Sequence, residues 1–152
     1  MIALLKLIHL SSVLIWVGGM FFAYVVLRPA AVETLEPPLR LRLWNAVFRR
    51  FFTWVWGAIA TLLVTGTALI ALYGGFTQVG AHVHIMLLLA MIMTGVFSYV
   101  YFVCYRQLAA HVTAERWKEA GVQLGKIRQL VGLNLSLGVL TVCVVVFGIN
   151  GW

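Results

Sequence analysis

Four long apolar runs, separated by three polar gaps, make up most of this chain of 152 residues. A helix that crosses the hydrocarbon core of a bilayer needs about 20 consecutive apolar residues, and each run reaches that length. Hydrocarbon offers no hydrogen-bonding partners, so the backbone groups must be paired within each run, which favours helices. We therefore predict four membrane-spanning helices, at about residues 2–28, 51–73, 82–106 and 127–149.

The polar gaps predict shorter elements at the membrane surface. Residues 38–50 alternate arginines with bulky apolar side chains, a pattern typical of an amphipathic helix that lies on the cytoplasmic surface and runs into the second span. The stretch His111–Gly125 is expected to form another short cytoplasmic helix. The predicted fold class is all-α, a single membrane domain over residues 1–152 built as a four-helix bundle.

The distribution of charge predicts the direction of each helix. Ten of the eleven Lys and Arg residues lie at or beside the first and third gaps, whereas the gap at residues 73–81 has no charge. Cationic loops stay on the cytoplasmic side of a bilayer. Both termini are therefore expected on the extracytoplasmic side of a bacterial-type inner (plasma) membrane.

Composition excludes several functional classes. Apolar residues make up 63% and charged residues 10% of the chain, against roughly half and a quarter in a soluble domain. The net charge of +7 therefore indicates the lipid bilayer as partner, not nucleic acid, because no soluble basic face remains outside the spans. The sequence does not support a hydrolase, because all four acidic residues lie in the predicted cytoplasmic gaps and leave no carboxylate pair within the spans. Four arginines at the inner edge are expected to meet lipid phosphates: Arg28, Arg49, Arg50 and Arg128.

The candidate chemistry lies in three histidines near the predicted outer surface. His9 is on the first span, and Trp16 and Met20, seven and eleven residues further on, share its helix face within about 20°. His82 and His84 open the third span at a similar depth. Two residues on a helix are about 200° apart, so we predict that His84 points into the bundle and His82 toward head groups or water. If the helix began after His84, both imidazoles would instead converge on one small ion.

Two imidazoles on facing helices predict a haem b site between the first and third spans, because haem iron takes such axial ligands. His9 and His84 would bind the iron, and Trp16, Gly19 and His82 would complete the cofactor site. The protein would then have a redox role, in electron transfer or as an oxidase, with a redox partner or a quinone-like or porphyrin-like lipophilic substrate. Small residues that would leave room for the porphyrin, or that simply pack helices, are Gly18, Gly19, Gly95 and Gly138.

Copper is the alternative cofactor, because imidazole and soft thioether ligands select Cu(I). Met86 and Met20 would join His9 and His84 as ligands, and Met91 and Met93 are also available. Methionine is equally common as a packing residue in membrane helices, and no MxxM cluster adjoins the histidines.

A structural subunit is the third interpretation, and in it the histidines bind no cofactor. His9 would then form a hydrogen bond with a hydroxyl such as that of Ser12 or Ser136. The glycine-rich faces would also permit a homo-oligomer.

The first span, HLSSVLIWVGGMFFAYVVLRP, resembles the opening helix of the HemJ and CopD-like membrane proteins. In that helix a histidine precedes a tryptophan by seven positions, with a glycine three further on, which corresponds to His9, Trp16 and Gly19. The segment AHVHIMLLLAM is similar to the HemJ segment in which a histidine, here His84, opens an aliphatic run, and RQLVGLNLSLGV is similar to the small CopD-like proteins.

This resemblance implies a four-span fold, a b-type haem held by His9 and His84, and a redox role. HemJ is associated with the oxidation of protoporphyrinogen, and CopD with copper movement. Met86 stands where these proteins tend to have a lysine. The departure argues against a direct transfer of HemJ activity, and a methionine there would suit a copper site or plain packing.

Overall fold

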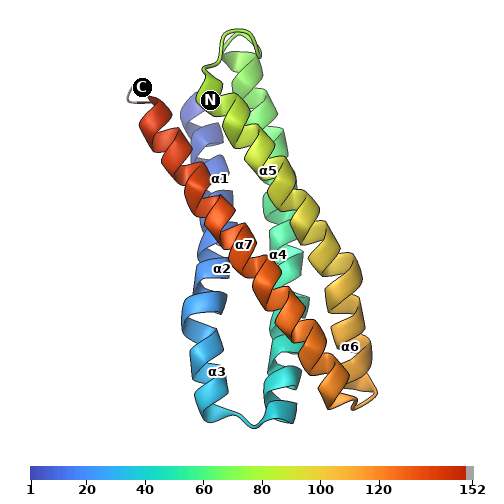
Figure 1. Cartoon of the computed structure of the whole chain (residues 1–152). Helices are drawn as coiled ribbons and strands as arrows, with labels where there is room; N and C mark the ends of the chain where they lie inside the picture. Colours follow the sequence, from blue (N-terminus) through green and yellow to red (C-terminus); the bar gives the residue numbers. More distant parts are fainter. Residues whose placement is uncertain (150–152) are drawn as a thin grey trace.

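The computed structural model describes residues 1–149, and every regular element in that part of the chain is helical. Four helical rods run the length of the molecule and pack into an elongated bundle (Figure 1). All four are long and apolar enough to cross a membrane. The predicted all-α fold with four spans is therefore confirmed.

The first rod runs without a break from Ile2 to Thr34. It contains two π-helical stretches, whose wider turns shift the faces of the helix relative to a regular α-helix. The second stretch ends at Leu27, two residues before Pro29, which has no backbone N–H to donate. The elements of this rod are α1 (Ile2–Val13), η1 (Leu14–Gly18), α2 (Gly19–Phe21), η2 (Phe22–Leu27) and α3 (Arg28–Thr34).

The other three rods are joined by short links. The second rod is α4 (Pro37–Leu72), and the fourth is α7 (Trp117–Ile149). The link after α4 turns at Gly74 and Gly75, whose φ angles of 94° and 90° suit glycine. The third rod consists of α5 (Ala81–Tyr99), η3 (Val100–Tyr105) and α6 (Arg106–Thr113).

Residues 38–50 form the first turns of α4 and continue directly into the second span. Their apolar side chains Leu41, Trp44 and Phe48 are buried in the core of the bundle. The third rod extends equally far at this end and gives them protein contacts, such as Phe48 to Tyr105 at 6.4 Å between ring centroids. The stretch predicted as the other surface helix is likewise divided, between the end of α6 and the beginning of α7.

The centre of the bundle is an aromatic cluster around Phe52, which is 2% exposed. Its ring stacks on Phe48 at 5.0 Å and meets the edges of Phe97 and Tyr105 at 5.3 and 5.2 Å. Trp16 joins the first rod to this cluster through Phe97, at 6.3 Å. Lipid tails are as apolar as the core, so close packing of this kind drives helix association in a bilayer.

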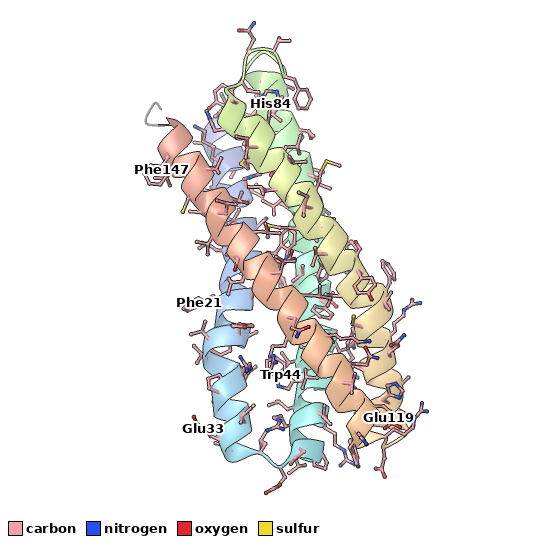
Figure 2. All side chains as sticks on the ribbon, viewed as in Figure 1. Phe21, Glu33, Trp44, His84, Glu119 and Phe147 are labelled. Carbon is pink, nitrogen blue, oxygen red and sulfur yellow. The ribbon has the colours of Figure 1, made fainter. Side chains whose placement is uncertain are left out.

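The outer surface of the bundle is apolar, as contact with lipid requires. Phe21 on the first rod and Phe147 on the fourth are 53% and 66% exposed, and both project from the bundle (Figure 2). Trp54 on α4 and Leu88 on α5 are 66% and 59% exposed. Each rod therefore turns one apolar face outward and another into the core.

The two ends of the bundle differ in chemistry. The beginning of α1, the link at residues 73–80 and the last turns of α7 lie together, and we call this the histidine end (Figure 1). The links at residues 35–36 and 114–116 lie at the opposite end, which we call the arginine end.

Adjacent glycines on the first rod provide a matched test of packing. A methyl group at Gly19 would overlap the ring of Phe51, whereas one at Gly18 would meet nothing within 4 Å. We expect Gly19→Ala to destabilise the fold by about 1–3 kcal/mol, the usual cost of overpacking. Gly18→Ala should be neutral or stabilise by up to about 1 kcal/mol, because alanine is the better helix former. Unfolding by SDS titration in mixed micelles measures both, and equal effects would contradict the packing described.

Candidate functional site

A cavity of about 250 Å³ lies inside the bundle between all four rods, and we call it the histidine cavity. Its walls are almost entirely apolar. His9 is its one imidazole, and Met86 and Met93 are its two thioethers. Other side chains that define it are Trp16 and Val17 on the first rod, Leu62, Gly66, Thr67 and Ile70 on α4, and Gly138 and Thr141 on α7.

The imidazole of His9 is held in one tautomer by α4. The Thr65 hydroxyl lies 2.6 Å from the carbonyl oxygen of Thr61, to which it donates its only proton. The Thr65 hydroxyl oxygen lies 2.7 Å from Nδ1 of His9, so it accepts a hydrogen bond from the Nδ1–H. Nε2 consequently keeps a lone pair that can bind a metal ion. Gly66 lies directly beside the ring, because a methyl group there would be in ordinary van der Waals contact with Cε1 of His9, at 3.4 Å.

Met86 and Met93 lie seven residues apart on α5 and therefore share one helix face. Met93 is 3% exposed, and its carbonyl oxygen accepts a hydrogen bond of 3.1 Å from Nδ2 of the buried Asn134. A methyl group at Gly138 would lie 2.9 Å from Cγ2 of Val17, so glycine lets α7 approach the first rod closely, and the Met93 Cε lies beside the same position at ordinary contact distance, 3.4 Å. These contacts position the Met93 thioether in the same cavity as the His9 imidazole.

The structure reverses the predicted orientations of His82 and His84. His84 is exposed beside the α4–α5 link, with its ring 6.1 Å from that of Phe76 and Nδ1 3.3 Å from the carbonyl oxygen of Gly80 (Figure 2). His82 is half-buried and packs against Gly148 of α7, where any added methyl group would overlap it. Helix α5 begins before His82, so the two rings point in different directions, as expected for residues two apart on a helix. The fourth rod, however, packs on the side of α5 that carries His82, and not on the side that carries His84.

The other predicted site residues occupy different places. Trp16 lines the histidine cavity with His9. Gly19 packs against Phe51 and does not line the histidine cavity. Met20 is buried beyond Trp16, beside a separate void of about 10 Å³, and is not in the histidine cavity either.

The metal-ligating side chains in the histidine cavity suit Cu(I) better than haem iron. Because His84 is outside the cavity, the two-imidazole arrangement predicted for haem b is not supported. Residues 1–149 contain no group of three or more His, Cys, Asp or Glu side chains able to hold a metal ion. The remaining combination, one imidazole with two thioethers, is typical of sites for Cu(I).

Two residues of the candidate site, Met93 and Thr65, were not singled out by the sequence analysis. Met93 was one of several available methionines, and its seven-residue spacing from Met86 is the signal that would have selected it. Thr65 has no comparable signal. The hydroxyls suggested as partners of His9 are instead bonded within their own helices, Ser12 to the carbonyl of Ile8 and Ser136 to that of Gly132.

The fold and the cavity define the class: a four-helix, multi-pass membrane protein with an imidazole and two thioethers lining an apolar cavity between its helices. The chain matches the family model described as copper resistance protein D over residues 45–147, and it belongs to that family. No curated protein and no solved structure matches the chain.

The matched region begins in α4 and ends in α7, so it includes both cavity methionines but not His9. It supports the CopD part of the sequence resemblance and gives no support for HemJ in particular.

Proposed function

We propose that this protein binds Cu(I) in the histidine cavity and handles copper within the membrane. The observation that carries the proposal is the presence of the His9 imidazole and the Met86 and Met93 thioethers in one apolar cavity. Membership of a family described as copper resistance protein D supports the same metal.

The donor set favours the monovalent ion. Nε2 of His9 and the two thioether sulfurs are all neutral, and no carboxylate from residues 1–149 lines the cavity. A divalent ion would keep its full charge in an apolar interior, where uncompensated charge is costly. Cu(I) has half that charge and prefers soft sulfur ligands. Thr65 would act as the supporting partner that fixes the imidazole tautomer, as ligand histidines usually require.

The charge distribution gives the proposal a direction. The rule that cationic loops stay in the cytoplasm places the arginine end inside the cell. The histidine cavity, toward the other end, would then receive copper from the extracytoplasmic side.

Methionine variants test the proposal. We expect Met86→Leu and Met93→Leu each to weaken Cu(I) binding by roughly tenfold or more, since even changes outside the ligand set cost about 10–100-fold. Met91→Leu is the matched control, because Met91 is on the same helix, is 62% exposed and does not line the cavity. The measurement is competition with a Cu(I) chelator in detergent under reducing conditions.

Two results would contradict the proposal. One is elemental analysis showing that the protein, after loading with Cu(I), does not retain copper in near-stoichiometric amount. The other is equal affinity in the cavity variants and in Met91→Leu. A Soret band in the purified protein would return the haem interpretation to consideration.

A further inference from the structure

A second cavity, of about 280 Å³, lies at the arginine end between the first rod, α4 and α7. The first rod and α7 diverge toward this end (Figure 1). The cavity has a cationic part, formed by Arg28, Arg40 and Arg128, and an aromatic part that includes Tyr24, Trp44 and Trp117. We call it the arginine cavity. It shares no lining residue with the histidine cavity, so it calls for a separate explanation.

Three arginines from three different rods line the cavity, and none of them has an acidic partner among residues 1–149. Within residues 1–149 the one ion pair joins Arg42 to Glu115, at 2.9 Å, and no carboxylate lines the cavity. Arg28 and Arg40 are half-buried, which keeps part of their positive charge away from bulk water. Three unneutralised cations at one cavity attract an anion, and guanidinium groups match phosphate oxygens particularly well.

Neighbouring arginines and a glycine fix the positions of the aromatic side chains in the cavity. The Tyr24 ring lies under the Arg28 guanidinium, 5.5 Å from its centre, and a methyl group at Gly132 would lie 3.1 Å from it. Trp117 is covered by the Arg42 guanidinium at 5.2 Å. The buried Trp44 completes a wall that suits hydrocarbon. The cavity is therefore cationic on one part of its surface and apolar on the rest.

We propose that the arginine cavity binds one acidic phospholipid, with the phosphate between the three arginines and the upper part of an acyl chain along the aromatic wall. Basic pockets between membrane helices on the cytoplasmic side recognise such head groups. The volume is near the lower end of small-molecule pockets, roughly 300–1,000 Å³, so it accommodates a head group while the rest of the lipid stays in the bilayer. Bound there, the lipid would connect the diverging first rod to the rest of the bundle.

The test compares lipids retained by the protein in native mass spectrometry after exchange into detergent. Wild type should retain phosphatidylglycerol in preference to phosphatidylcholine. The triple variant Arg28→Gln, Arg40→Gln, Arg128→Gln should lose phosphatidylglycerol affinity on the order of 100-fold, since each cation near an anionic lipid contributes about a fivefold factor.

The matched control is Arg49→Gln, Arg50→Gln, Arg116→Gln. It removes the same charge from exposed arginines outside the cavity, and its affinity should stay within about fivefold of wild type. Equal losses in the two triple variants would overturn the proposal, because diffuse charge would then explain binding. Equal retention of phosphatidylcholine, or displacement of the lipid by an equal concentration of inorganic phosphate, would also overturn it.

A second variant keeps the test decisive if the arginine triple variant fails to fold. Gly125 lines the cavity, and a side chain there would meet nothing within 4 Å at its first carbon. Gly125→Leu should therefore reduce lipid retention at least tenfold with all three arginines intact. Gly95→Leu, at an exposed position that is equally open and outside the cavity, is its control. Full retention in Gly125→Leu would exclude the cavity as the lipid site, and Cu(I) affinity should be unchanged in every variant.

Discussion

His9→Ala is expected to weaken Cu(I) binding by more than about 100-fold, because it removes the one nitrogen ligand of the histidine cavity. Changes that only disturb the support of a metal ligand already cost about 10–100-fold. Chelator competition in detergent measures the loss. A change below about tenfold would show that copper binds elsewhere, and the proposed site would have to be abandoned.

Thr65→Val belongs to the same experiment and separates the ligand from its support. Valine keeps the shape of threonine but cannot accept the hydrogen bond from Nδ1, so we expect a loss of about 10–100-fold. Thr67→Val is the matched control, because Thr67 lines the same cavity while its hydroxyl donates to the carbonyl of Leu63, at 2.8 Å. Equal effects of the two valine variants would mean that the tautomer of His9 does not matter for binding.

Phe52→Ala is expected to have the largest effect on stability, a loss of about 3–5 kcal/mol in the free energy of unfolding. The Phe52 ring contacts five other aromatic rings on α4 and the third rod, so its removal leaves a void where two rods meet. Each aromatic pair also contributes about 0.5–1.5 kcal/mol beyond its buried area.

Phe21→Ala is the control for this variant, since Phe21 is 53% exposed on the outside of the first rod. We expect it to cost less than about 1 kcal/mol, because lipid chains replace its contacts. SDS titration in mixed micelles measures both variants. If the two losses were similar, the aromatic cluster would not be the centre of the fold.

The fold was predictable from sequence wherever the bilayer imposes a rule. Apolar length alone identified four spans, because a helix of fixed rise must cross hydrocarbon of fixed thickness. The same rule does not predict how residues outside the apolar runs pack. Residues 38–50 satisfy the pattern of a surface helix, yet Leu41 and Phe48 pack against neighbouring rods whose reach is not visible in the sequence of α4 itself.

The site was predictable only within a single helix. The seven-residue spacing placed His9 and Trp16 on one face, and the structure brings both to the same cavity. Choosing between His82 and His84 required knowing on which side α7 crosses α5, and helix periodicity contains no such information. The same holds for Thr65, which becomes a partner of His9 only through the packing of α1 on α4.

The aromatic cluster also sets how copper would move. Trp16 and Phe97 are 3% and 4% exposed, and with Phe52 they fill the bundle between the histidine cavity and the arginine end. A void of about 10 Å³ beside Trp16, Phe52 and Phe97 is far smaller than either cavity, so these rings separate the two cavities. Copper bound as proposed would therefore reach the arginine end only if the rods part.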